Sequence, residues 1–484
     1  MRGAGWLRGA LPLVLLASAC ARDNPAYRGV QEDAGVLPDG GDDRDGRAGD
    51  GGDQRDGSQS GDAAPGTCTS GAKTCLGNVL LKCDAGSWVP LKDGPSLCVV
   101  GDLGGYCGGF YPSNELPKCG GYDSALLAFV ADTGAPVVID TDTYTITQNA
   151  VELAWVAHAE FDQGADAPAL ALFKFDSFQV PAGATVVAVG KRALAVWAQG
   201  DVVVAGALRA GGAVITALPV IRQPAGAWTP AATWTAGAGG VGTEGAGLGG
   251  GGYGAKGGAG GHGPPPTSAP GGSGGLVYGT EDLIPLRGGS PGGGASTNRS
   301  ITAGGGAIQI VACRSFALRQ GGVVSASGQG GTGGTVMLSG GEFLLTGGDG
   351  GGSGGAILIE SPLIHLAAVI AANGGGGGGG AALGPGTSHG ERGEDGHEDD
   401  VAAAGGEPAS PYAGKGGVGG VLSVPAGGNA GSATATGSSA GGGGGGVGRI
   451  RLNVTTLDRA DLGIVDAAGA LVSPAPTKGE KPIW

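Results

Sequence analysis

One stretch in the last quarter of the 484-residue chain gathers side chains that could bind a divalent cation. Residues 388–400 read SHGERGEDGHEDD and hold two histidines among six carboxylates. Imidazole nitrogens and carboxylate oxygens are ligands of divalent ions, and the candidate ligands are His389, His397, Glu391 and Asp395. A glycine-rich segment holds such a ligand set poorly. We therefore expect a solvated acidic segment here, with no metal and no cofactor.

A pair of aspartates offers a second kind of chemistry. Asp140 and Asp142 lie in VVIDTDTYTIT, residues 137–147, and two carboxylates on one strand face could act as acid and base on an acidic glycan. The same residues also suit the end of a strand. The chain contains no H-E-x-x-H, G-x-S-x-G or Walker pattern. We therefore predict a non-enzymatic protein with no catalytic residues, and a carbohydrate-active β-helix enzyme, a polysaccharide lyase or hydrolase, is the alternative.

Six of the eight cysteines crowd into 52 residues. In an exported chain a dense, even set of cysteines indicates a disulfide framework whose pairing the sequence does not assign. The gaps between them are too long for a zinc site. Cys313 lies far along the chain inside a predicted strand, where we expect it to be an unpaired, buried thiol. The six clustered cysteines are Cys68, Cys75, Cys83, Cys98, Cys107 and Cys119.

The N-terminus predicts export. The segment MRGAGWLRGALPLVLLASAC combines two arginines, a short apolar run and small residues before Cys20, which is typical of a secretory signal. Its last four residues resemble the bacterial lipobox, and this implies lipid attachment at Cys20. Ala17 and Ala19 also form a site for ordinary signal cleavage. We expect a lipid-anchored protein at the outer membrane or cell surface, with secretion as the alternative.

The charge of the chain restricts its partners. The 42 acidic residues outnumber the 28 basic ones, and a net charge of −14 repels the phosphates of nucleic acid. No second apolar run approaches the roughly 20 residues of a transmembrane helix. The expected partners are the lipid bilayer, through the N-terminal anchor, and an extracellular polysaccharide or surface protein.

Four stretches of the chain repeat one plan. Each has two or three short runs rich in Val, Ile and Leu, followed by small residues and glycine. Units that cannot each bury their own apolar face indicate a stacked architecture, so we predict an all-β fold, a parallel β-helix-like solenoid with long glycine-rich loops. The stretches are residues 193–212, 307–331, 356–375 and 449–469, and GTVMLSGGEFLLTGGDGG (333–350) fits as a shorter copy.

Glycine supplies 112 residues and concentrates at about 234–306 and 374–447. Added loop length costs little closure entropy, which favours flexible excursions between the strands. Packing of extended polyglycine segments on one another is an equally weighted alternative, because backbones without side chains can approach closely. On the loop interpretation, replacing Gly375 to Val447 with a short linker leaves the strands folded, whereas Ile357→Asp or Ile450→Asp does not.

These signals divide the chain into successive parts. They are a signal peptide (1–19), a lipid attachment site with a disordered acidic tether (20–66), a small cysteine-rich disulfide module (67–120), entry strands or a cap (121–172), the β-solenoid with its two glycine-rich insertions (173–475) and a C-terminal tail (476–484).

Several segments also resemble one family. Residues 173–210, 283–294, 304–318 and 441–452 are similar to the glycine-rich β-helical surface lipoproteins of myxobacteria and their relatives, an uncharacterised family. The segment CTSGAKTCLGNVLLKCDAGSW (68–88) resembles small cysteine modules that recur behind the signal in such lipoproteins. The resemblance implies an exported, repeat-built surface protein with a structural, display or adhesion role, and it supplies no catalytic residues.

Overall fold

A computed structural model describes most of the chain beyond the N-terminal region, in two compact units. Unit 1 holds the residues up to Gly94 together with Cys98–Cys107, and unit 2 holds Pro95–Leu97 and Gly108–Trp484. The predicted signal, Cys20 and the acidic tether lie outside the described residues. The structure describes residues 70, 72–76, 79–93, 97–101, 104–120, 123–153, 156–165, 167–211, 223–227, 237–243, 245–294, 302–339, 341–384, 388–455, 464–466 and 469–482.

Unit 1 contains a small antiparallel sheet. Strands β1(Lys73–Leu76), β2(Val79–Asp84) and β3(Ser87–Asp93) pair in sequence order, and β4(Leu97–Gly101) pairs with β5(Gly104–Gly108). Asp84 faces Ser87 across a two-residue turn. Both turn residues, Ala85 and Gly86, have positive φ (48° and 82°), as a tight hairpin turn requires. Cys83 in β2 is disulfide-bonded.

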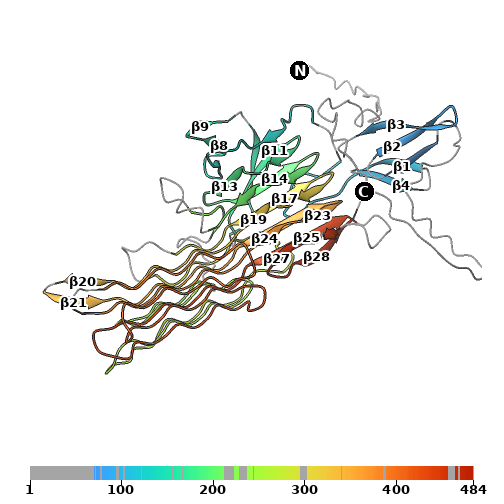
Figure 1. Ribbon diagram of the computed structural model, residues 1–484. Helices are drawn as coiled ribbons and strands as arrows, with labels where there is room; N and C mark the ends of the chain where they lie inside the picture. The colour runs from blue at the N-terminus through green and yellow to red at the C-terminus, as the bar shows by residue number, and fades with distance from the viewer. Residues whose placement is uncertain are drawn as a thin grey trace, which may run out of the picture. The chain divides into compact units, whose positions relative to one another are not determined.

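Unit 2 is built on three mainly parallel sheets (Figure 1). The seven-stranded sheet has the order β10(Ala157–Phe161), β11(Leu170–Phe175), β14(Ala193–Ala198), β17(Ala307–Ala312), β22(Ala356–Ser361), β25(Arg449–Thr455) and β28(Thr477–Lys481). The six-stranded sheet has the order β26(Ile464–Asp466), β23(Ile364–Leu366), β18(Phe316–Leu318), β15(Val202–Val204), β12(Phe178–Val180) and β6(Phe129–Val130). The eight-stranded sheet has the order β27(Leu471–Ser473), β24(Val369–Ala371), β19(Val323–Ser325), β16(Ala207–Arg209), β13(Thr185–Val189), β7(Val137–Asp140), β8(Thr145–Gln148) and β9(Val151–Glu152).

The first three repeated stretches each contribute one strand to each of these three sheets, and the fourth contributes β25 and β26, with β27 just beyond its end. In the seven-stranded sheet Ile308 pairs with Ile357, which pairs with Ile450. These β-branched side chains are at most 2% exposed and belong to one continuous apolar core. The regular spacing of apolar runs therefore sets the register, because a slip of one residue would turn every side chain to the opposite face.

The expected fold class, a parallel β-helix-like solenoid with long glycine-rich loops, is wrong. Most strands of unit 2 form three separate sheets, and antiparallel pairs at β10–β11, β7–β8 and β8–β9 are joined to the parallel ones. The glycine-rich segments are ordered rather than loop-like. The chain leaves the three sheets after β16, β19 and β24 and returns to them at β17, β22 and β25. We call the described residues of the glycine-rich segments, within 210–306, 326–355 and 372–448, the glycine arm.

Hydrogen bonds with a period of three hold the glycine arm together. Along residues 374–380, each N–H donates to one of three neighbouring segments, and every third N–H donates to the same one. Three residues per turn is the geometry of an extended polyproline II helix. Gly374, Gly377 and Gly380 donate to Gly420, Gly417 and Gly414, whereas Gly375 and Gly378 donate to Gly352 and Asp349, and Gly376 and Gly379 to Glu394 and Glu391, all at 2.8–2.9 Å.

A segment of the arm that has neighbouring segments on all sides needs glycine at every position, whereas a segment at the edge needs it only where it faces a neighbour. A Cβ on Gly376 would lie 2.0 Å from the carbonyl oxygen of Ala404, and one on Gly377 would lie 1.8 Å from that of Gly442. The interior run 374–380 is therefore glycine throughout. At the edge of the arm, residues 390–396 keep glycine only at every third position, and the four side chains between these glycines are partly or fully exposed.

Candidate functional site

The acidic segment 388–400 lies along the edge of the glycine arm. Because the segment is extended, its two histidines, eight residues apart, are separated by roughly 25 Å at 3.1 Å per residue. His397 Nε2 lies 3.1 Å from Glu394 Oε2, whereas His389 Nδ1 accepts a hydrogen bond from the N–H of Val336 at 3.3 Å. Within the described chain, no group of three His, Cys, Asp or Glu side chains is placed to hold a metal ion.

The carboxylates of this segment have structural partners. Asp395 accepts a hydrogen bond from the N–H of Gly330 at 2.8 Å. Glu398 binds Arg209 through two hydrogen bonds of 2.6 and 2.7 Å, and these raise the pKa of the Arg209 guanidinium. The acidic side chains therefore tie an edge segment of the arm to its neighbours, including the end of β16.

Asp140 and Asp142 stabilise a turn at the end of β7. Asp140 is 8% exposed, and its Oδ1 accepts hydrogen bonds from the N–H groups of Asp142 and Thr143 at 2.9 and 3.3 Å. Asp142 accepts one from the N–H of Lys191 at 2.9 Å and lies 3.6 Å from Arg192. A carboxylate that bonds backbone N–H groups two and three residues later is typical of a turn. Asp140 has this role, and Asp142 links the turn to the neighbouring segment at Lys191 and Arg192.

A disulfide corrects the expectation for Cys313. Cys313 is bonded to Cys119, 194 residues earlier, with their Cα atoms 5.2 Å apart. Cys119 ends a segment, residues 108–120, that we call the strap, and the strap belongs to unit 2. The predicted cysteine module at 67–120 is thus divided after Cys107. The sequence did not indicate this pairing, because the two cysteines are 194 residues apart.

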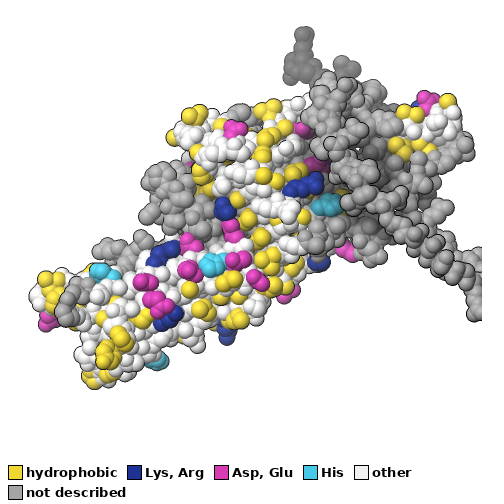
Figure 2. Space-filling view, viewed as in Figure 1, with side chains coloured by type: hydrophobic (Ala, Val, Ile, Leu, Met, Phe, Trp, Pro, Cys, Tyr) yellow, Lys and Arg dark blue, Asp and Glu magenta, His cyan; other side chains and the backbone are white. Residues whose placement is uncertain are grey.

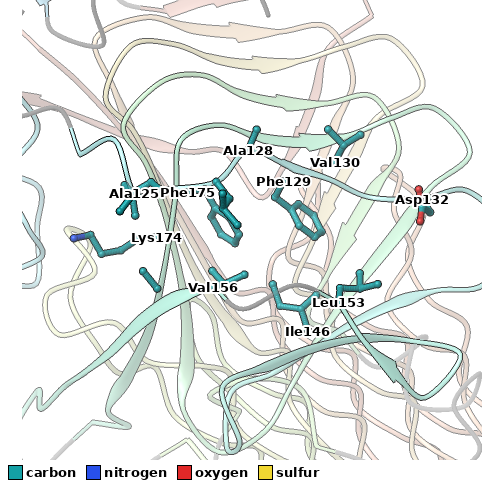
Figure 3. A pocket seen from close by; sticks show the side chains of 13 residues that line it. Ala125, Ala128, Phe129, Val130, Asp132, Ile146, Leu153, Val156, Lys174 and Phe175 are labelled. Atoms are coloured by element: carbon teal, nitrogen blue, oxygen red, sulfur yellow. The ribbon is translucent and has the colours of Figure 1, made fainter. Parts of the chain in front are cut away.

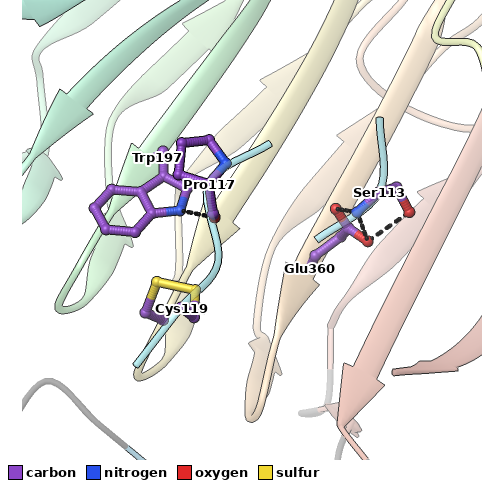
Figure 4. Close-up of a disulfide and its surroundings, with 6 residues drawn as sticks. Ser113, Pro117, Cys119, Trp197 and Glu360 are labelled. Carbon is purple, nitrogen blue, oxygen red and sulfur yellow. Dashed lines mark hydrogen bonds between the residues drawn. A yellow bond between two sulfur atoms is a disulfide. The ribbon is translucent and has the colours of Figure 1, made fainter. Parts of the chain in front are cut away.

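The strap lies against the seven-stranded sheet beside this disulfide (Figure 4). The indole N–H of Trp197 in β14 donates to the Pro117 carbonyl at 2.9 Å. The side chain of Gln309 in β17 donates to the Ser113 carbonyl at 3.1 Å. Phe110 is fully buried. The sequence signal for a covering segment was the presence of a polar residue, such as Gln309, in an otherwise apolar strand of this sheet.

Strands β20(Val336–Ser339) and β21(Glu342–Leu345) form a hairpin at the far end of the glycine arm (Figure 1). The interpretation of residues 333–350 as a shorter repeat is therefore wrong. Met337 pairs with Leu344, and Leu338 pairs with Phe343, so each face of the hairpin carries one exposed apolar pair. The four side chains are 46%, 54%, 67% and 56% exposed, respectively. Two apolar runs around Gly-Gly were a hairpin signal that the repeat interpretation overlooked.

Other turns of the arm meet at the same end. Tyr412 is 61% exposed, and its carbonyl accepts a hydrogen bond from the Ser438 hydroxyl at 3.0 Å. The N–H of Leu383 donates to Gly437 at 2.7 Å. Figure 2 shows hydrophobic side chains gathered at this end, where the hairpin projects. We call β20–β21 and the exposed residues Leu383 and Tyr412 the distal tip.

Comparison with protein-family models, curated proteins and solved structures finds no match to this chain. No helix in the described part of the chain is long and apolar enough to span a bilayer. The distal tip is therefore taken as the candidate functional site on its geometry alone. Apolar side chains exposed at turns that a rigid scaffold positions are typical of binding sites.

Proposed function

We propose that this chain is a non-enzymatic, exported display protein in which the glycine arm presents the distal tip to an apolar surface or partner. The observation that carries the proposal is the hairpin β20–β21, which exposes an apolar pair on each of its two faces. A two-stranded hairpin in water is marginally stable by itself, and one intended to remain in water normally has a polar face. Both faces of this hairpin have the composition of a strand that a partner covers.

The construction of the arm supports a role in presentation. Ten residues, 326–335, lead from the end of β19 to the hairpin, which is roughly 31 Å in an extended helix of 3.1 Å per residue. Backbone hydrogen bonds tie this leg to its neighbours, including Gly331 to Gly376 and Gly334 to Gly379, both at 2.8 Å. A leg held in this way keeps the hairpin at a fixed distance from the sheets, as a flexible linker would not.

The proposal places anchoring at the other end of the chain. A lipid on Cys20 would fix the protein to the outer membrane or cell surface. Mass spectrometry of the mature N-terminus is expected to show a lipidated Cys20, and Cys20→Ala is expected to release the protein from the membrane fraction. An unmodified N-terminus with unchanged fractionation would remove the anchor from the proposal.

Adsorption to defined surfaces tests the role of the distal tip. The variant Leu338→Ser/Leu344→Ser removes one exposed apolar side chain from each face of the hairpin, and Val401→Ser/Val424→Ser removes two of similar exposure (56% and 58%) elsewhere on the arm. Binding to an alkyl-terminated monolayer, measured with a quartz crystal microbalance, is expected to weaken at least about tenfold for the hairpin variant only, since each buried side chain contributes about 1.5–3 kcal/mol.

Other results of these experiments would contradict the proposed function. Equal adsorption of the hairpin variant and wild type to the alkyl surface, or equal loss in the Val401 and Val424 control, would remove the hairpin from the proposal. Cleavage of acidic polysaccharides by the purified protein would favour the enzymatic alternative instead.

A further inference from the structure

An apolar cavity lies at the β6 end of the six-stranded sheet, where the strands of unit 2 begin (Figure 3). Its volume is 210 Å³. The cavity is bounded by the segment around β6, by β8 and the residues that follow β9, and by β10 and β11, and it is partly open to solvent, since Leu127 and Val130 in its lining are 55% and 53% exposed. Its lining consists of Ala125, Leu126, Leu127, Ala128, Phe129, Val130, Asp132, Ile146, Leu153, Val156, Ala157, Lys174 and Phe175.

Aromatic packing fixes one wall of the cavity. The rings of Phe129 and Phe178 stack at 4.8 Å, and those of Phe129 and Phe175 meet at 5.5 Å. Phe129, Ile146 and Phe175 are at most 8% exposed. Side chains held in this way do not collapse into the space beside them, because each is already packed against the core.

The charges around the cavity exclude a charged ligand. Of the thirteen lining residues, only Asp132 and Lys174 are charged. The ammonium group of Lys174 lies over the ring of Trp197, 5.5 Å from its centroid. In Figure 3, Lys174 and Asp132 lie at opposite ends of the cavity, with apolar side chains between them. A buried charge would therefore meet no partner along most of the wall, which is costly.

We propose that this cavity binds a small neutral aromatic molecule of one ring. An apolar cavity of about 150 Å³ is large enough to bind benzene, so 210 Å³ accommodates one ring with one or two additional carbon atoms. Phe129 and Phe175 offer ring contacts of the kind that aromatic pairs prefer. This site is independent of the distal tip, which lies at the far end of the glycine arm.

Ligand-observed NMR and thermal unfolding with toluene test the site. In the full chain, saturation transfer to toluene and a rise in Tm of about 1–3 °C near ligand saturation are expected, whereas benzoate, which carries a charge, gives neither. Val156→Phe fills the cavity and is expected to abolish both effects. Val151→Phe, which makes the same change at a site that is 64% exposed, is expected to retain them.

Two results would overturn the proposal. The first is the absence of toluene binding to the wild type. The second is equal binding to wild type and Val156→Phe, when circular dichroism shows both to be folded.

Discussion

Glu360 and Ser113, 247 residues apart in the sequence, are joined by three hydrogen bonds on the face of the seven-stranded sheet opposite the core. The N–H of Ser113 donates to both carboxylate oxygens at 3.1 and 3.0 Å, and its hydroxyl donates at 2.8 Å. Gln309 and Asn453 donate from the strands on either side at 2.7 and 3.0 Å. Glu360 is fully buried, and Lys481 Nζ is 3.4 Å from its Oε1. One carboxylate therefore ties the strap to four strands.

Lys481→Met is expected to destabilise unit 2 by about 3 kcal/mol. The substitution keeps the length of the side chain but leaves the buried carboxylate of Glu360 without its cation, and an uncompensated buried charge is strongly destabilising. Lys478→Met on the same strand is the matched control, because Lys478 is exposed. Urea unfolding monitored by fluorescence measures both. A difference between the two variants within about 0.5 kcal/mol would contradict the role given to the pair.

The strap shows where prediction from the sequence reached its limit. Short runs rich in Val, Ile and Leu predicted the strands around Ile308 and Ile357, as is typical of strands buried in a sheet. Gln309 and Glu360 in the same strands remained unexplained, because their partner lies in a segment that the cysteine spacing had assigned to another module. Contacts between residues about 200 positions apart leave no local pattern, so neither the Cys119–Cys313 bond nor the burial of Glu360 followed from the sequence.

Removal of the Cys119–Cys313 bond is expected to loosen the strap while the sheets remain folded. The bond closes a loop of 194 residues, for which chain entropy sets a contribution of about 5 kcal/mol. Cys119→Ala, Cys313→Ala and the double variant should lose equal stability, because each removes the same bond. Limited proteolysis should then cut within residues 108–120, with circular dichroism of the strands preserved. Resistance of the strap to cleavage, or additive losses in the double variant, would contradict this assignment.

Two tyrosines, the half-buried Tyr144 and the buried Tyr253, make stability depend on pH in the alkaline range. Burial and the hydrogen bond to Glu160 raise the pKa of Tyr144 to about 12. Burial raises the pKa of Tyr253 well above its usual range, although the guanidinium of Arg449 lies 5.7 Å from its ring. Because the folded state raises these pKa values, it binds the phenolic protons more tightly than the unfolded state does. The stabilisation is present below the unfolded pKa of about 10 and is lost as pH rises through the folded values.

Titration of tyrosinate absorbance checks this pH dependence. Tyr144→Phe is expected to remove a reversible component centred near pH 12. Tyr253→Phe is expected to reduce the loss of stability above pH 10, roughly the ordinary tyrosine value. Tyr412→Phe is the control for the loss of one chromophore, since this residue is exposed. Retention of the component near pH 12 in Tyr144→Phe would show that another tyrosine produces it.

The glycine arm was the least predictable part of the fold from sequence. Composition alone is the same for a flexible loop and for packed extended helices, so the two interpretations of residues 374–380 stood equal. The signal that distinguishes the two interpretations is the spacing of the non-glycine residues along each segment. Lys415 and Val418 are three positions apart and exposed, between glycines whose N–H groups are bonded to neighbours. A period of three in the non-glycine residues thus indicates a surface helix of the arm, and an unbroken run indicates an interior one.

Gly377→Ala is expected to destabilise the arm far more than Gly384→Ala. A Cβ at Gly377 would lie 1.8 Å from the carbonyl oxygen of Gly442, a backbone atom that cannot rotate away, whereas Gly384 has nothing within 4 Å. Overpacking of this kind costs about 1–3 kcal/mol or more. Thermal unfolding of both variants gives the difference, and equal Tm values would mean that the segment is not packed in solution.

Replacement of Gly375 to Val447 with a short linker removes almost all of the third segment of the glycine arm (372–448). The loop interpretation expected the strands to tolerate this change. In the structure, the N–H groups of Gly351, Gly354 and Gly258 donate to carbonyls of Gly443, Gly446 and Gly444 at 2.8–2.9 Å. The deletion would remove these acceptors and expose the first two segments of the glycine arm (210–306 and 326–355). We therefore expect the amides of these two segments to lose protection in hydrogen exchange. We also expect a fall in Tm comparable to that of Ile357→Asp. Unchanged protection of residues 347–355 after the deletion would show that the excursions are independent and would restore the loop interpretation.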